Sequence, residues 1–165
     1  MIRCLRIEAA MNIEGPVEVV FDTSVIIGAI LESCGEEQGQ SRRAFNSIVM
    51  RLNHILRFSD AIIKECIKHF NFKGIYAKLI LTTKLGQLPD NKIKKCSYRS
   101  EDIQLEVPVL HEEDRPILET AVAIKRRGIT ICLVHKNPRH FDPISDEMQG
   151  HHGILVQSAG EYIDP

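Results

Sequence analysis

The stretch that decides the fold of this chain reads Val17-Glu18-Val19-Val20-Phe21-Asp22-Thr23-Ser24-Val25-Ile26-Ile27. An apolar run ends abruptly in Asp-Thr-Ser, and a second apolar run begins at once. This pattern predicts a buried strand over 17–21 and a helix over 25–31, because threonine and serine favour the N-cap position just before a helix. In open α/β sheets, functional side chains gather at the carboxyl ends of the strands. Asp22 is therefore the first candidate functional residue.

Apolar residues recur along the rest of the chain in patterns that predict further helices and strands. Helices are expected from Ser41 toward Leu56, over 60–70 after the capping residue Ser59, over 114–127 and over 158–163. Strands are expected at 55–58, 107–109, 129–134 and 153–156, whereas residues 73–102 are less regular. Because strands alternate with helices, we expect an α/β fold, a three-layer α/β/α sandwich around a parallel, Rossmann-like sheet.

Composition limits the classes of function that the chain can have. Its 165 residues, 44% of them apolar, predict one domain with a substantial core. A net charge of -1 means that any nucleic-acid binding would have to come from a local patch. No run of about 18 apolar residues occurs, so neither a transmembrane helix nor a membrane partner is expected.

The cysteines and the first residues bear on the setting of the protein and the limits of its domain. The cysteines number five and show no CxxC spacing, which indicates a reducing, cytoplasmic setting. Cys66 and Cys132 are expected to be small core residues. Gly15 and Pro16 interrupt the chain before the first clear strand. We therefore expect residues 1–16 to form an N-terminal extension and residues 17–165 to form the domain.

Three carboxylates stand out by their positions. Asp22 ends the first strand, Glu65 lies in the helix 60–70, and Asp114 opens the helix 114–127. Each has a simpler explanation. Asp22 and Asp114 are both placed to cap the helix that follows, and Asp114 also to favour its dipole. Glu65 is of a type that is usually solvated on a helix surface. The three indicate a functional site only if the fold brings them together.

Four segments of the chain resemble those of PIN domains in order and spacing. PIN domains are small metal-dependent nuclease modules, found in toxin–antitoxin ribonucleases and in RNA-processing enzymes. The matching segments are 20–27, 58–65, 114–121 and 131–141, and the similarity spans roughly residues 17–163. The resemblance implies a PIN-like sheet and a metal-dependent endoribonuclease that hydrolyses RNA phosphodiester bonds.

The resemblance also implies which residues form the site and what they bind. Asp22, Glu65 and Asp114 would hold Mg²⁺ or Mn²⁺, hard cations that take oxygen ligands, and would act in catalysis with it. Ser24 would orient a ligand or water beside Asp22. Many proteins of this kind dimerise, so the expected partners are RNA, a second copy of the chain and a small antitoxin protein.

The fourth acidic position of the family falls near Asn137, where this chain departs from the pattern. Asn137 offers one neutral carbonyl oxygen but no charge. Asp142 follows five residues later as an alternative carboxylate. Losing one acidic ligand should weaken metal binding. A catalytically weak or inactive PIN-like module that binds RNA or a protein is therefore the alternative function.

Basic residues and histidines are less specific. The cationic side chains of 73–102 either follow RNA phosphates or form a solvated segment. The candidates for RNA contact are Lys92, Lys94, Lys95 and Arg99. Histidines at 135, 140, 151 and 152 invite a transition-metal site, but no HExxH pattern supports one, and surface or loop positions are favoured.

An aspartate at a strand end also occurs in phosphotransfer proteins of the haloacid-dehalogenase and response-regulator kinds. The haloacid-dehalogenase pattern has a second aspartate two residues after the first, where this chain has Ser24. A response regulator has an acidic pair before its phosphorylated aspartate, and this sequence offers none in a suitable place. Neither GxGxxG nor GxxxxGK[ST] occurs, so a nucleotide cofactor is not expected.

Overall fold

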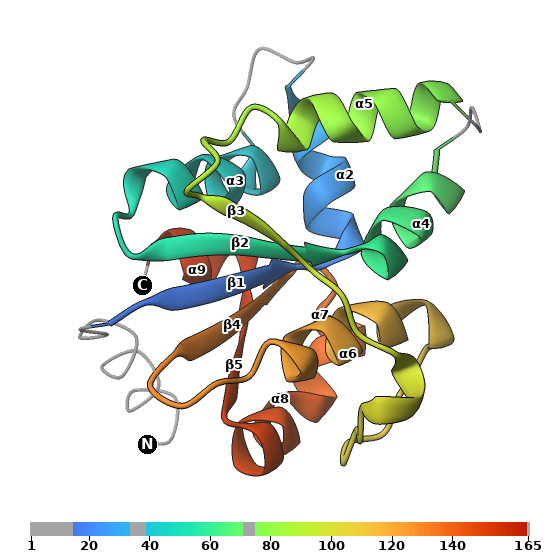
Figure 1. Cartoon of the computed structure of the whole chain (residues 1–165), viewed down its shortest axis with the longest axis vertical. Coiled ribbons are helices and arrows are strands. Elements are labelled where there is room, and N and C mark those ends of the chain that lie inside the picture. The colour runs from blue at the N-terminus through green and yellow to red at the C-terminus, as the bar shows by residue number, and fades with distance from the viewer. Residues whose placement is uncertain (1–14, 34–38, 71–74, 165) are drawn as a thin grey trace.

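The computed structural model describes residues 15–33, 39–70 and 75–164, and its strands alternate with helices along the chain (Figure 1). The main elements are β1 (Val17–Phe21), α2 (Thr23–Glu32), α3 (Gln40–Met50), β2 (His54–Ser59), α4 (Asp60–Lys68), α5 (Ile75–Leu85), β3 (Ile93–Cys96), α6 (Arg115–Ala123), β4 (Thr130–His135), α7 (Pro138–Phe141), α8 (Ser145–Glu147), β5 (Ile154–Ser158) and α9 (Ala159–Ile163). Short helical turns add η1 (Ser100–Asp102), η2 (Glu112–Asp114), η3 (Asp142–Ile144) and η4 (Met148–His152). Most of the N-terminal extension predicted over 1–16 lies outside the described residues.

Five parallel strands form one sheet in the order β3-β2-β1-β4-β5. The central strand β1 pairs with β2 on one side and with β4 on the other. All of its residues are buried, as expected for a strand that is covered on both faces. The chain runs outward from β1 to β3 and then returns to β4, so the strand order reverses between β1 and β4. Ligands of open α/β sheets bind at such a reversal, outside the carboxyl ends of the strands.

Helices cover both faces of the sheet, so the predicted three-layer α/β/α sandwich is confirmed. On one face, the ring of Phe21 in β1 packs against Phe45 of α3 and Tyr162 of α9, with ring centroids 6.2 and 6.0 Å apart. Side chains alternate along a strand, which directs Glu18 to the other face. There its Oε1 atom accepts a hydrogen bond of 2.6 Å from Arg126, just beyond α6.

Two predicted elements differ from the structure because apolar residues outside regular elements were included in them. The helix expected from Ser41 toward Leu56 ends at Met50, and Leu56 belongs to β2. Leu52 extends the apolar pattern but is 94% exposed, in the turn between these two elements. Within the described chain, the strand expected over 107–109 does not form, and buried Val107 lies in a loop.

Residues 73–102 are more regular than their sequence indicates, because they include α5 and β3. The apolar residues of α5 do not share one face. Leu81 is buried, whereas Ile75, Tyr76 and Leu79 are exposed. Such a helix lacks the amphipathic period that identifies one from sequence. Edge strand β3 is short and contains two lysines, so its sequence lacks the apolar pattern that predicts a strand.

The other predicted elements are confirmed, with shifts of a few residues at their ends. Helix α6 ends at Ala123, earlier than the expected residue 127. Gly128, at a φ of 77°, then forms the turn that leads into β4. Cys66 and Cys132 are buried, as predicted for core residues. The sheet and its helices thus place the ends of β1 and β4 side by side.

Candidate functional site

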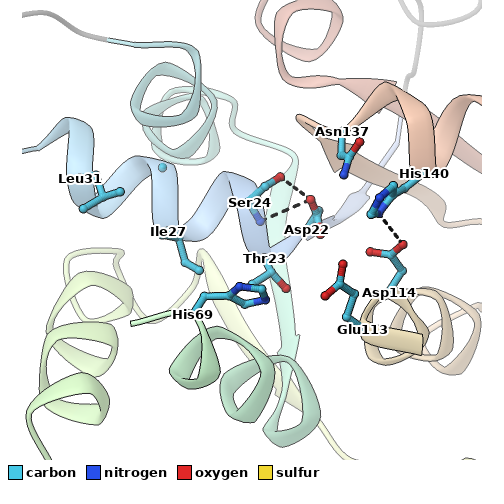
Figure 2. A pocket seen from close by; sticks show the side chains of 11 residues that line it. Asp22, Thr23, Ser24, Ile27, Leu31, His69, Glu113, Asp114, Asn137 and His140 are labelled. Carbon is cyan, nitrogen blue, oxygen red and sulfur yellow. Dashed lines mark hydrogen bonds and ion pairs between the residues drawn. The ribbon is translucent and has the colours of Figure 1, made fainter. Parts of the chain in front are cut away.

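A pocket of about 350 Å³ opens at the carboxyl ends of β1 and β4, where the strand order reverses (Figure 2). Acidic and imidazole groups from distant segments face it. The pocket is lined by Asp22, Thr23, Ser24, Ile27, Gly28, Leu31, His69, Glu113, Asp114, Asn137 and His140. The fold therefore brings together Asp22, Ser24, Asp114 and Asn137, four of the site residues predicted from sequence.

Asp22 follows β1 and is almost fully buried. As the N-cap residue of α2, it accepts hydrogen bonds at Oδ2 from the Ser24 hydroxyl and, at 3.3 Å, from the Ser24 backbone N–H. Burial raises the pKa of its carboxyl group to about 6; the hydrogen bonds from Ser24 oppose this rise, and the negative charge of Asp114 adds to it. Asp22 thus caps a helix and also lines the pocket, and it is costly to ionise without a cation nearby.

Asp114 lies at the N-cap position of α6, but makes no capping hydrogen bond through its side chain to the described residues. Its Oδ2 atom instead lies 2.9 Å from Nδ1 of His140, which lines the same side of the pocket (Figure 2). Burial raises the pKa of the Asp114 carboxyl group, and the charge of neighbouring Glu113 adds to this, whereas His140 and His111 lower it. The capping explanation therefore fails for Asp114, whose carboxylate faces the pocket.

A chain of hydroxyl groups fixes α6, and with it Asp114, against the end of β2. Ser59 closes β2 and caps α4, where its hydroxyl accepts a hydrogen bond of 3.3 Å from the backbone of Ile62. The same hydroxyl lies 2.8 Å from that of Thr120 in α6. The Thr120 hydroxyl in turn lies 3.3 Å from the hydroxyl of Tyr98. These contacts hold α6 against the carboxyl edge of the sheet.

Glu65 is buried, so the explanation of a solvated helix residue is wrong. Its carboxylate contacts Lys68 at 2.6 Å and His69 at 3.7 Å, both within α4 or at its end. Among the described residues, it is not part of the lining of the pocket. Its carboxylate lies within 4.8 Å of the potential ligand atoms of His69 and Glu113, and both of these residues line the pocket.

Asn137 and Asp142 lie on different sides of the chain that leaves β4. Asn137 lines the acidic pocket, as the family resemblance implies for the fourth position. Asp142 instead lines a second pocket with His135, whose Nε2 atom is 3.5 Å from the Asp142 carboxylate. The alternative that Asp142 replaces the missing carboxylate is therefore wrong.

The four candidates for RNA contact have different surroundings. Lys92 is buried, and its ammonium group donates to the backbone carbonyl oxygens of residues 51, 52 and 54 at 2.7, 2.9 and 3.4 Å. This corrects the prediction for Lys92, because its charge is used inside the fold. Lys95 forms an ion pair of 2.7 Å with Asp60. Lys94 and Arg99 are exposed, at or just beyond the edge strand β3.

Three ionisable residues of the pocket were not predicted as part of an acidic site: His69, Glu113 and His140. His69 follows Glu65 by four residues, a spacing that places both on one side of a helix and was available as a signal. Glu113 is one of three consecutive acidic residues at 112–114, and only the structure shows which of them face inward. His140 was expected at a surface or loop position, where no helical or strand period indicates the direction of a side chain.

Two groups of side chains in the described part of the chain can hold a metal ion. One contains His111, Glu113 and His140, and the other contains Glu65, His69 and Glu113. The potential ligand atoms of each group lie within 4.8 Å of one another. Glu113 belongs to both groups, so they adjoin at the pocket. These groups show that acidic and imidazole side chains, including the predicted ligand Glu65, can hold a cation here.

Comparison with known proteins gives no family for this chain: no family model matches it, and a search of curated proteins finds no match. Within the residues that the structure describes, no helix is both long and apolar enough to cross a membrane.

Proposed function

We propose that the protein is a metal-dependent endonuclease that hydrolyses RNA phosphodiester bonds with Mg²⁺ or Mn²⁺. The observation that carries this proposal is the meeting of Asp22 and Asp114 in one pocket at the carboxyl ends of parallel strands. Both are buried, and burial raises the pKa of both carboxyl groups. Paired carboxylates that are costly to ionise are stabilised by a divalent cation, which they can share.

The donor set fits a hard cation. Asp22, Glu113 and Asp114 point into the same space in Figure 2, and the side chain of Asn137 adds an amide. Oxygen ligands of this kind suit Mg²⁺ and Mn²⁺. In this proposal Glu113 supplies the carboxylate that Asn137 does not, and Glu65 supports the site through its proximity to Glu113.

The residues around the pocket have distinct roles in the proposed reaction. A bound Mg²⁺ or Mn²⁺ would lower the pKa of a water and neutralise charge on the scissile phosphate. Asp22 and Asp114 would hold the ion in their charged forms. Ser24 fixes the orientation of Asp22 by donating to Oδ2. His140 donates from Nδ1 to Asp114 and so favours its charged form.

The substrate and partners follow from the family resemblance together with the charges on the surface. Lys94 and Arg99 are exposed cations that can meet RNA phosphates, and Lys95 lies beside them in an ion pair. The proposal takes two partners from the same resemblance, a second copy of the chain and a small antitoxin protein. It also includes a cytoplasmic location. The overall charge of -1 restricts RNA binding to such a local patch.

Cleavage of RNA by the purified chain in Mn²⁺ or Mg²⁺ tests the proposal. We expect cleavage that EDTA abolishes and that Asp22→Asn and Asp114→Asn each reduce by at least about a hundredfold, because each removes a charged ligand. Asp90→Asn, in an exposed turn far along the chain, is the matched control and should cleave like the original protein. Equal cleavage by all four proteins would contradict the proposal.

The alternative is a PIN-like module that binds RNA or a protein without cleaving RNA. The neutral Asn137 favours it, because the pocket has an uncharged amide where the family has its fourth acidic residue. Titration calorimetry separates the two functions. Tight RNA binding without heat from added Mn²⁺ would favour the alternative, whereas cleavage that Asp114→Asn abolishes would exclude it.

A further inference from the structure

We propose that His111, Glu113 and His140 form a binding site for a transition-metal ion of the Zn²⁺ class, at the rim of the acidic pocket. The three residues come from the segment before α6 and from α7, and their potential ligand atoms lie within 4.8 Å of one another. Two imidazoles and one carboxylate are a typical protein ligand set for Zn²⁺. This site does not depend on the proposed nuclease activity.

The contact between His140 and Asp114 prepares one ligand for the metal. Nδ1 of His140 lies 2.9 Å from Oδ2 of Asp114, which leaves Nε2 as the ring nitrogen for an ion. Histidines that bind metal usually donate their other ring N–H to a carboxylate, which fixes the tautomer and makes the ligand nitrogen more basic. Asp114 therefore has the position of a supporting carboxylate behind His140.

His111 supplies the second imidazole from the opposite segment. Its ring stacks on that of His140, with centroids 3.7 Å apart and an angle of 20° between the planes. The nitrogens of stacked rings do not converge on one point, so one ring must turn when an ion binds. His111 is exposed, and its ring can change rotamer without disturbing the core. Glu113 is also exposed and can follow the ion.

The ligand chemistry separates this site from the proposed Mg²⁺ or Mn²⁺ position. Imidazole nitrogens favour Zn²⁺, Co²⁺ and Ni²⁺, whereas Mg²⁺ prefers oxygen ligands. With three protein ligands, a tetrahedral ion keeps a fourth position open to water. Glu113 is a ligand in both proposals, and Asp114 is a ligand in one and a supporting carboxylate in the other, so His111 and His140 decide the test.

Calorimetric titration of the full chain with Zn²⁺, in EDTA-treated buffer, tests the site. We expect His111→Ala and His140→Ala each to weaken Zn²⁺ binding by at least about tenfold, because each removes a ligand. Asp114→Asn should weaken it by about 10- to 100-fold, the usual effect of losing a carboxylate behind a metal-binding histidine. Co²⁺ in place of Zn²⁺ should give a visible absorption band that the two histidine variants lose.

Matched variants show whether Zn²⁺ binds elsewhere. His151→Ala removes an exposed histidine whose partner is Glu106, and should bind Zn²⁺ like the original chain. Asp22→Asn, which tests the proposed nuclease site, should also leave Zn²⁺ binding intact. Unchanged binding in His111→Ala would overturn the proposal even if His140→Ala were unstable. If His69→Ala lost Zn²⁺ binding and His111→Ala kept it, the ion would belong to Glu65, His69 and Glu113. That result would also overturn the proposal.

Discussion

Nδ1 of His140 lies 2.9 Å from Oδ2 of Asp114, and this contact joins α7 to the start of α6 across the candidate site. Helix α6 and strand β4 separate the two residues in the sequence, and the packing of this helix and strand makes them neighbours. The contact works against the effect of burial, which raises the pKa of the Asp114 carboxyl group, whereas His140 lowers it.

Replacing this histidine should therefore change the ionisation of the aspartate. In His140→Ala we expect the pKa of Asp114 to lie higher than in the original protein, because burial and Glu113 still raise it and the opposing contact is lost. Carboxyl ¹³C NMR over a pH series, without divalent ions, measures this. His151→Ala is the control, and should leave the Asp114 titration unchanged. The same Asp114 titration in His140→Ala and the original protein would contradict the prediction.

Asp22 should make the stability of the metal-free protein depend on pH. Its carboxyl group has a pKa of about 6 in the folded chain, above the ordinary value of 3.8. Between these values the folded protein keeps a proton that the unfolded chain has lost, so stability falls as pH rises through this window. Above it the loss stays constant, at about 3 kcal/mol from the usual ~1.4 kcal/mol per pKa unit.

Urea unfolding of Asp22→Asn and of the original chain, from pH 4 to pH 7 in EDTA, measures this contribution. The variant has no titrating group at this position, so its advantage in free energy of unfolding should be absent near pH 4 and greatest above pH 6. Saturating Mn²⁺ should reduce the difference, because a bound cation stabilises the charged carboxylate. A constant difference between the two proteins at every pH would rule out this role of Asp22.

The sheet could be predicted from sequence because its central strands carry strong local signals. Strand β1 is apolar except for Glu18, and residues 131–134 of β4 form a continuous apolar run, so both strands were found with the residues at their ends. Asp22 and Asp114 were found for the same reason, since each stands beside a strongly patterned element. The α5–β3 region gave no such signal, because α5 exposes apolar residues and β3 is short and polar.

The rest of the site depends on contacts that no local pattern contains. Glu112 and Glu113 are chemically the same, but the turn η2 places only Glu113 in the lining of the pocket. His140 faces Asp114 because a short helix follows β4 at that point. Lys92 shows the reverse error, since a lysine in a basic segment is expected in solvent and this one is buried on backbone carbonyls. Charge and composition cannot distinguish these positions.

Lys92 should contribute to stability rather than to RNA binding. Its ammonium group donates to the carbonyl oxygens of Arg51 and Leu52, between α3 and β2, and of His54, the first residue of β2. Lys92→Met removes the donor and leaves these acceptors without it, which should cost about 2 kcal/mol of unfolding free energy. Lys94→Met, at an exposed position two residues along, should change stability by less than about 0.5 kcal/mol.

RNA affinity should respond in the opposite way in these two variants. Under the proposed function, filter binding should show weaker RNA binding for Lys94→Met, and unchanged binding for the folded fraction of Lys92→Met. The salt dependence of binding should also become less steep in Lys94→Met, because a phosphate contact is lost. A Lys92→Met protein that is fully stable but binds RNA poorly would reverse our assignment.

Gly28 should be required for the close packing of α2 against α3. A Cβ atom at this position would clash with the hydroxyl of Ser41 and would lie 2.9 Å from the Ser41 Cβ. Gly28→Ala should therefore destabilise the protein by about 1–2 kcal/mol, although alanine favours a helix over glycine by about 1 kcal/mol. Gly150→Ala, where a Cβ would meet nothing within 4 Å, provides the comparison.

The decisive measurement is Gly28→Ala in a Ser41→Gly background, which removes the clashing side chain. There Gly28→Ala should become neutral or stabilising, and an identical loss in both backgrounds would show that the packing of these helices does not set the requirement.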